Sequence, residues 1–160
     1  MSTARPAPGM ADASKARLRL WLRLLRVTRL VEGELRERLR VGFDTTLPRF
    51  DVLAALHRSG EGLRMSELSN VLRVSNGNVT GIIDRLVADG LVVRVPVAGD
   101  RRAMLVRLTR KGAEDFAKLA AAHEDWVNEL LGSVTAAEAD QLVAKLQAVR
   151  DRLADKGAKG

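Results

Sequence analysis

Hydrophobic positions between Ser66 and Gly112 change their period along the chain, and this change predicts an order of elements. Leu68 and Leu72 lie four residues apart, as on one face of a short helix. A second helix follows, whose apolar stripe comprises Val79, Ile82, Ile83, Leu86 and Val87. The β-branched run at 91–95 then predicts a strand, and a second strand and another helix follow a basic turn. This order is that of a winged helix-turn-helix, a module whose second helix enters a DNA groove.

The other face of the second predicted helix is polar. It carries Asn76, Asn78, Thr80, Gly81, Asp84 and Arg85. Amides and hydroxyls near a helix N-terminus can bond base edges or phosphates. Ser66 is placed to cap the preceding helix, residues 74–76 form a short turn, and Gly90 ends the second helix. An ordinary amphipathic helix with a solvated polar face is the competing interpretation.

Residues 96–102 form a basic connection between the two predicted strands. Arg94 precedes it, and Arg101 and Arg102 lie within it. A two-stranded ribbon with a basic tip fits a minor groove, whose negative potential attracts arginine. Asp100 is close enough in sequence to pair with Arg102 and to hold its guanidinium. The alternative is a solvated hairpin whose charges aid solubility.

Two segments, LSNVLRVSNGNVTGIIDRLVADGLVVR and the wing GDRRAMLVRLTRKG, resemble the MarR family of bacterial winged-helix transcription factors. The resemblance covers roughly residues 14–155, and the D-x-R wing followed by L-T-x-x-G is its most specific part. It implies that Arg102 enters the minor groove and that Asp100 is its supporting carboxylate. The predicted DNA-binding residues are Ser66, Asn76, Asn78, Thr80, Arg85, Arg94, Asp100, Arg101 and Arg102.

The flanking helices predict a symmetric dimer. The helix expected at 14–40 has apolar residues on two faces, more than one winged-helix core can cover. The C-terminal helix opens with a capping box of Thr135 and Glu138. Its apolar residues then follow the spacing of a coiled-coil seam: Leu142, Leu146, Val149 and Leu153. The resembled family dimerises through these same helices, whereas the residues alone also allow a monomeric bundle.

The fold class predicted is therefore mainly α with a small β-wing, a winged helix-turn-helix between N- and C-terminal dimerisation helices. We expect a mobile arm at 1–13, one domain at 14–155 and a tail at 156–160. Within the domain, residues 45–108 form the winged lobe. The stretches 14–40 and 109–155 supply the dimerisation helices.

Composition agrees with a nucleic-acid partner. The 160 residues carry a formal net charge of +7, which favours a polyanion without implying sequence specificity. No cysteine is present, which excludes disulfides and a thiol sensor. No signal-peptide core or long apolar segment appears, so a cytoplasmic protein is expected. The basic first helix with Trp21 could lie on an anionic membrane, but that reading leaves the recognition helix and wing unexplained.

Enzyme activity is not expected, and neither is a metal or a cofactor. The chain has two histidines on separate predicted helices, no tyrosine, and no phosphate-binding or zinc motif. The predicted function is a sequence-specific transcriptional regulator that binds a pseudo-palindromic duplex, with a non-specific architectural DNA binder as the alternative. By analogy with the resembled family, a repressor is expected.

The resemblance also implies a small effector, in a crevice between the dimer helices and each lobe. The matching positions are Arg26, Arg29, Phe50, His57 and His123. Arginine pairs with carboxylates, whereas phenylalanine and histidine offer flat surfaces. Residues 43–50 are similar to those of members that control aromatic catabolism, which suggests an aromatic acid or its CoA thioester. A core role for the histidines is the alternative.

Overall fold

The computed structural model describes residues 8–72 and 76–157, with side chains placed for 12–72 and 78–157. The chain divides into two compact units, Met1–His123 and Glu124–Gly160. The predicted class is confirmed, since helices dominate and one three-stranded antiparallel sheet is present among the described residues. The elements are α1 (Pro8–Phe43), α2 (Leu47–Ser59), β1 (Leu63–Arg64), α3 (Met65–Leu72), α4 (Asn76–Ala88), β2 (Val92–Val97), β3 (Asp100–Leu108), α5 (Arg110–Leu130) and α6 (Ala136–Gly157).

The first helix is longer than predicted. It begins at Pro8 rather than at residue 14, so residues 8–13 are helical, while residues 1–7 of the expected arm lie outside the described part. Proline is tolerated in a first helical turn, and the alanines that follow favour helix. At the other end, α6 runs to Gly157, and residues 158–160 of the expected tail are outside the described part.

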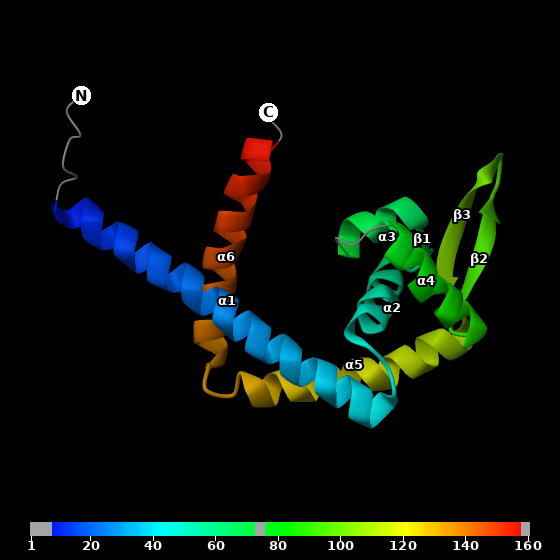
Figure 1. Ribbon diagram of the computed structural model, residues 1–160, viewed down its shortest axis with the longest axis horizontal. Coiled ribbons are helices and arrows are strands. Elements are labelled where there is room, and N and C mark those ends of the chain that lie inside the picture. Colours follow the sequence, from blue (N-terminus) through cyan, green and yellow to red (C-terminus); the bar gives the residue numbers. More distant parts are fainter. Residues whose placement is uncertain (1–7, 73–75, 158–160) are drawn as a thin grey trace. The chain divides into compact units, whose positions relative to one another are not determined.

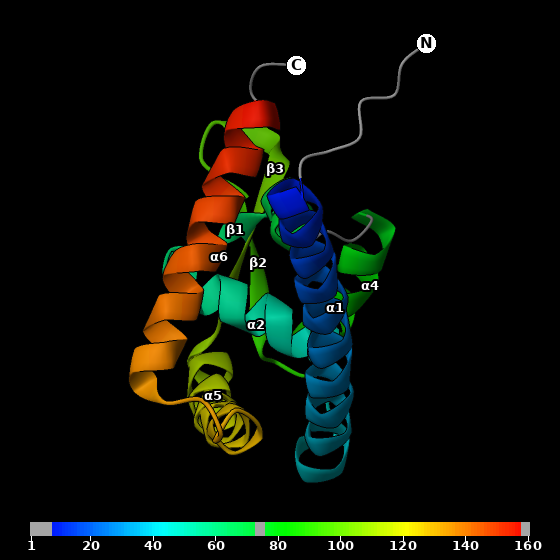
Figure 2. The same cartoon turned by 90° about the vertical axis from the view of Figure 1, so that its left-hand side faces the viewer.

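The winged lobe is built around the sheet, whose strand order is β1-β3-β2. Figure 1 shows the β2–β3 hairpin projecting from the helices of the lobe, and α2 packs against α3, α4 and β3 (Figure 2). The fully buried core comprises Leu39, Val52, Leu56, Leu68, Val79, Ile83, Leu86 and Val106. Each such side chain contributes about 1.5–3 kcal/mol by leaving water, so this core holds α4 and the sheet together.

The strand β1 was not predicted. It has only two residues, Leu63 and Arg64, which pair with Val106 and Leu105 of β3. Two residues cannot show the alternating pattern by which a half-buried strand is recognised. The sheet therefore has three strands where the sequence indicated a hairpin.

The end of α4 is fixed by a glycine, as predicted. Gly90 has φ 72°, and the amide of Leu91 donates to the carbonyl of Leu86 at 2.9 Å. This bond is the six-to-one hydrogen bond of a Schellman motif. The motif requires a left-handed backbone conformation at the residue before Leu91, which is Gly90. The apolar stripe of α4 ends earlier than expected, because Val87 is 37% exposed.

The start of α5 is fastened to this same junction. Thr109 Oγ1 accepts from the amide of Gly112 at 2.9 Å and donates to the carbonyl of Gly90 at 2.7 Å. The amide of Thr109 donates to the carbonyl of Leu91 at 3.0 Å. A Cβ at Gly112 would lie only 1.9 Å from that carbonyl oxygen, so only glycine fits here. The L-T-x-x-G pattern thus has a physical cause. Its threonine, Thr109, caps the start of α5, and its glycine, Gly112, allows the backbone of α5 to approach that of Leu91.

The second unit contains the end of α5 and the helix α6. The predicted capping box is confirmed, since the amide of Thr135 donates to Glu138 Oε2 at 2.9 Å and the amide of Glu138 donates to Thr135 Oγ1 at 3.3 Å. Hydrogen bonds from the Thr135 backbone and hydroxyl lower the pKa of Glu138 below its usual value. The seam residues of α6 are exposed within the chain, as Leu153 illustrates at 63%.

Candidate nucleic-acid interface

The helix α4 separates its apolar and polar residues as the sequence predicts. Val79 and Ile83 are buried, whereas Asn78, Thr80 and Arg85 are exposed. The polar face of α4 can therefore be reached by a large partner. Asn76, the last residue of the predicted turn at 74–76, lies in the first turn of α4, but its side chain and the other two turn residues fall outside the described part of the chain.

The wing is a tighter hairpin than the predicted loop at 96–102. β2 continues to Val97 and β3 starts at Asp100, so only two residues connect the strands, and Gly99 among them has φ 83°. Glycine accepts this positive φ at no steric cost. Arg101 and Arg102 therefore lie on β3 and not in the loop, in the stretch where the register with β2 shifts, and both side chains are exposed.

Asp100 supports the wing differently from the prediction. Its Oδ1 accepts a hydrogen bond from the backbone amide of Arg102 at 3.0 Å. Within the described residues its carboxylate makes no ion pair with the Arg102 guanidinium. The carboxylate therefore fixes the backbone at the start of β3. The guanidinium of Arg102 stays available to a partner.

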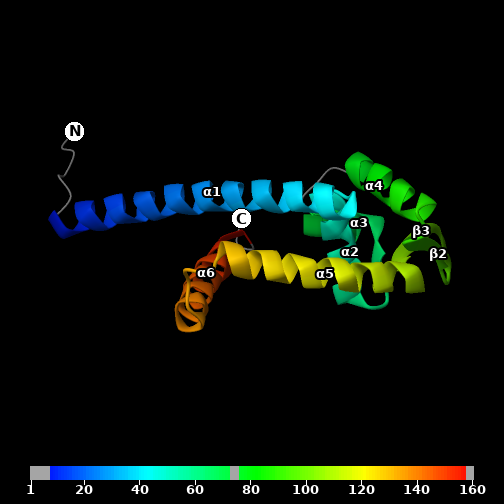
Figure 3. The same ribbon diagram turned by 90° about the horizontal axis from the view of Figure 1, so that it is seen from below.

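Arg94 connects the β2–β3 hairpin to α4, which is the predicted recognition helix. Its Nη2 donates to Asp84 Oδ1, and the Arg94 side chain is only 31% exposed. Figure 3 shows α4 alongside the β2–β3 hairpin that this pair connects. Arg94 is a predicted DNA contact, whereas the sequence predicts no role for Asp84. In the structure the two side chains position α4 against β2.

Ser66 does not cap its helix, because α3 already begins at Met65. The carboxylate of Glu67 instead accepts from the backbone amide of Arg64 at 2.6 Å. Ser66 is nevertheless exposed, and it lines a hollow of about 360 Å³ together with Asp100 and Arg102. The start of α3 and the beginning of β3 next to the hairpin turn therefore line one hollow.

Three of the five predicted effector residues meet in an aromatic cluster, which consists of Phe50, His57, Phe116 and His123. The rings of Phe50 and His123 stack, with centroids 4.5 Å apart and planes inclined by 21°. Phe116 lies 5.0 Å from the His57 ring and 5.7 Å from Phe50.

The two predicted arginines stand apart from the aromatic cluster. Arg26 and Arg29 are exposed on α1, and no hydrogen bond, ion pair or ring contact links them to those rings in the part of the chain described. Partial burial, followed by the nearby carboxylate of Glu32, raises the pKa of Asp51 above its usual value, while His123 and Arg58 act in the opposite direction. Asp51 is therefore a titratable group that interacts with His123 of the aromatic cluster and that the sequence does not single out.

A helix with an exposed polar face, braced by an ion pair against a hairpin with basic exposed residues, defines a winged helix-turn-helix DNA-binding protein. A sequence model of the MarR family matches residues 43–103. Known relatives extend this match over most of the chain. The chain belongs to the MarR family and is a DNA-binding transcriptional regulator.

Three comparisons illustrate the relationship. The transcriptional activatory protein BadR of Rhodopseudomonas palustris is 32% identical over 83% of this chain and 74% of its own length. A MarR family transcriptional regulator from Silicibacter pomeroyi superposes with a TM-score of 0.72 at 34% identity, covering 89% of this chain and 98% of that one. A mutant MarR of E. coli complexed with operator DNA gives a TM-score of 0.69 at 33% identity, covering 84% and 95%.

Family membership confirms the expectation of a regulator rather than an enzyme. Among the described residues, no helix combines the length and apolar character needed to span a bilayer. The same residues contain no group of three or more His, Asp or Glu side chains arranged to hold a metal ion.

Proposed function

We propose that the protein is a homodimeric repressor that reads a pseudo-palindromic operator and releases it when a small ligand binds. The observation that carries the DNA-reading role is the exposed face of α4, with Asn78, Thr80 and Arg85, beside exposed Arg101 and Arg102 on the wing. Asparagine suits bidentate contact with adenine in the major groove, and arginine suits the negative potential of a narrow minor groove. Arg94 then acts through Asp84, as a positioning residue.

The dimer is supported by apolar surface that each unit leaves uncovered within one chain. On α1 the exposed side chains are Leu18, Leu20, Trp21, Leu22, Val27 and Leu30, and on α6 they are Leu142, Val143, Leu146, Val149 and Leu153. Soluble proteins seldom leave so many large apolar side chains of one helix in water, and a second copy would cover them. A two-fold dimer presents two recognition helices to half-sites about one helical turn apart.

The effector is an aromatic acid or an aromatic acyl-CoA held near the aromatic cluster. The stacked rings of Phe50 and His123 offer a flat surface, and His57 adds a second imidazole. Arg26 and Arg29 of the same chain or of its partner would pair with the acid. Binding favours a lobe spacing that no longer matches the half-sites, and this releases DNA.

Selection from random duplex DNA at near-physiological salt tests the DNA-reading role, followed by anisotropy on the winning sequence. We expect an inverted repeat. Asn78→Ala should relax base preference at one symmetric pair of positions. Arg102→Ala should weaken binding by about 1–3 kcal/mol if it contacts the groove, whereas Arg152→Ala on α6 should not. A selection that enriches nothing, with binding lost steeply on adding salt, would indicate an architectural DNA binder instead.

Sedimentation of the free protein tests the dimer, and a monomer would overturn it. Benzoate, phenylacetate and phenylacetyl-CoA, titrated into the operator complex, test the effector. Release of the operator by one of these ligands, if His123→Ala abolishes it, supports binding at the aromatic cluster. If none of them releases the operator, this effector class is refuted. Transcription in vitro from the selected operator decides between repression and activation.

A further inference from the structure

The helix α4 contains a glycine whose presence the fold itself does not explain. Gly81 lies in the interior of α4, and its backbone is not in the left-handed region. A glycine in a helix interior lowers stability relative to alanine, because it loses more backbone freedom on folding. A Cβ at Gly81 would meet nothing within 4 Å, whereas one at Gly112 would lie 1.9 Å from a carbonyl oxygen. No contact within the described part of the chain therefore requires a glycine at position 81.

Gly81 lies on the side of α4 that faces away from the core. Val79, Ile83 and Leu86 are fully buried and define the inward side of the helix. Gly81 is two residues from both Val79 and Ile83, and two residues rotate the side-chain direction by about 200°. Gly81 is exposed and lines an open hollow of about 610 Å³ between α4 and the start of α2. At this outward position α4 therefore presents bare backbone to a partner.

Two of the predicted DNA-binding residues flank this position. Asn78 precedes Gly81 by three residues and Arg85 follows it by four, and these spacings place residues on one face of a helix. Both line the same hollow as Gly81. The polar face of α4 therefore has a gap between an amide and a guanidinium. Because asparagine is short, its amide reaches a base edge only if the helix backbone lies close to the floor of the groove.

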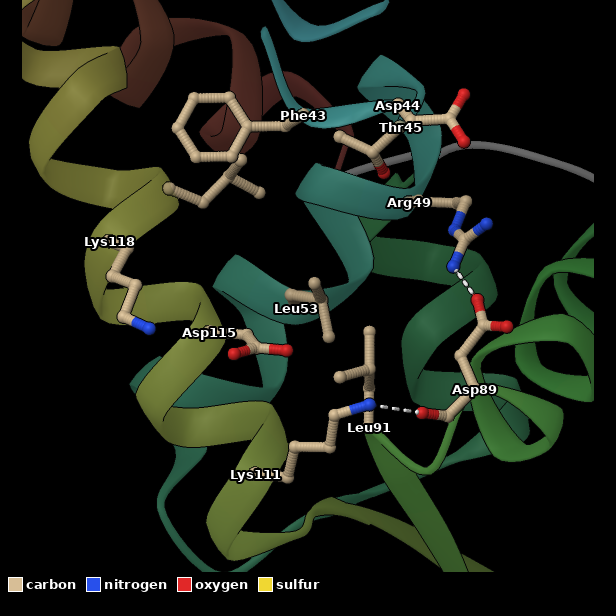
Figure 4. Close-up of a pocket in the computed structure, with 11 residues that line it drawn as sticks. Phe43, Asp44, Thr45, Arg49, Leu53, Asp89, Leu91, Lys111, Asp115 and Lys118 are labelled. Carbon is tan, nitrogen blue, oxygen red and sulfur yellow. Dashed lines mark hydrogen bonds and ion pairs between the residues drawn. The ribbon is translucent and has the colours of Figure 1, made fainter.

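The helix α4 is held in the lobe by its buried face and by ion pairs at two places. Asp84 pairs with Arg94 of β2. Arg49 of α2 pairs with Asp89, the residue that directly follows α4 (Figure 4). Tilting α4 to make room for a side chain at position 81 would strain these pairs and the core beneath them. An added side chain would therefore hold α4, and the lobe with it, away from the floor of the groove.

We propose that Gly81 is a specificity-determining residue, at which the backbone of α4 lies against a thymine methyl group in the major groove. In a helix interior the backbone amide and carbonyl bond along the helix, so Gly81 offers a base only its apolar Cα. The thymine methyl is the apolar feature that the major groove displays. A cytosine there leaves the contact unfilled, and a side chain at position 81 collides with the methyl. This inference rests on the proposed DNA-reading role of α4.

Selection from random duplex DNA, run in parallel for the wild type, Gly81→Ala and Gly33→Ala, tests the inference. Gly33 is the matched control, because it is a helix glycine of α1 with nothing within 4 Å of a Cβ. Both variants should melt about 1–4 °C above the wild type. Only Gly81→Ala should bind the wild-type winning duplex more weakly in anisotropy, by about tenfold or more. Its own selection should lose the preference for thymine at one symmetric pair of positions.

Replacing single thymidines of the winning duplex by deoxyuridine removes only the methyl group. At one thymine of each half-site, this change should weaken binding by the wild type and by Gly33→Ala about fourfold, the worth of one buried methyl group. The same change should strengthen binding by Gly81→Ala. If no uracil substitution distinguishes Gly81→Ala from the wild type, or if Gly81→Ala binds the winning duplex as tightly, the inference is overturned while the DNA-reading role stands. If the wild-type selection enriches nothing, the DNA-reading role fails and the inference fails with it.

Discussion

Gly112 offers the most direct test of how the wing and the helix α5 are joined. An alanine Cβ there would lie 1.9 Å from the Leu91 carbonyl oxygen, against 3.4 Å for ordinary contact, so the two backbones must separate by about 1.5 Å. Overpacking against atoms that cannot rotate away costs up to about 3 kcal/mol. Alanine regains up to about 1 kcal/mol of helix propensity. The net loss of unfolding free energy is therefore about 2 kcal/mol.

Thermal and urea unfolding followed by circular dichroism measures this loss. A loss of that size should lower the melting temperature by about 4–8 °C in a chain of this length. Gly33→Ala is the matched control, because nothing lies within 4 Å of a Cβ at that position of α1. It should instead stabilise the protein by about 0.5–1 kcal/mol. If Gly112→Ala were as stable as Gly33→Ala, the close approach would not constrain the fold.

Four further substitutions probe charged side chains. Asp84→Asn and Arg94→Gln should each cost about 0.2–1 kcal/mol, since the pair is partly solvated, and a double-mutant cycle should show that the two losses do not add. Because the pKa of Glu138 is lowered in the folded protein, its cap stabilises α6 at pH values above the unfolded-state pKa, and this stabilisation is lost as the pH falls through the folded-state pKa. The amide NMR shifts at the start of α6 should therefore change in acid, and Glu138→Gln should abolish that change. The raised pKa of Asp51 disfavours folding at neutral pH, so Asp51→Asn should raise the melting temperature at pH 7, and the gain should vanish in acid below both pKa values. Equal gains at both pH values would contradict the Asp51 argument.

The sequence predicted those parts of the fold whose causes are local. The stripe of α4, the glycine at its end and the capping box of α6 each depend on residues within a few positions of one another. Their periodicity and hydrogen-bonding chemistry can be read directly from the sequence. The same holds for the basic residues of the wing, whose pattern also carried the family resemblance.

Contacts between distant segments were not predictable in this way. Arg94 was an unpaired basic residue in the sequence, and only the packing of β2 beside α4 brings it to Asp84. Arg49 and Asp89 lie 40 positions apart and meet because α2 packs against α4. A two-residue strand such as β1 leaves no period to detect, and the aromatic cluster required the face of α2 that meets α5.

The outer strand of the wing also bears on how the protein behaves at high concentration. β2 is an edge of the sheet, and Pro96 within it has no amide hydrogen to offer another strand. The register is also irregular between Pro96 and Val97, which interrupts the ladder at that edge. The opposite edge, β1, is only two residues long. The β2 edge therefore resists sheet extension between molecules, so β2 strands of regulators bound at neighbouring sites should not pair with one another and start aggregation.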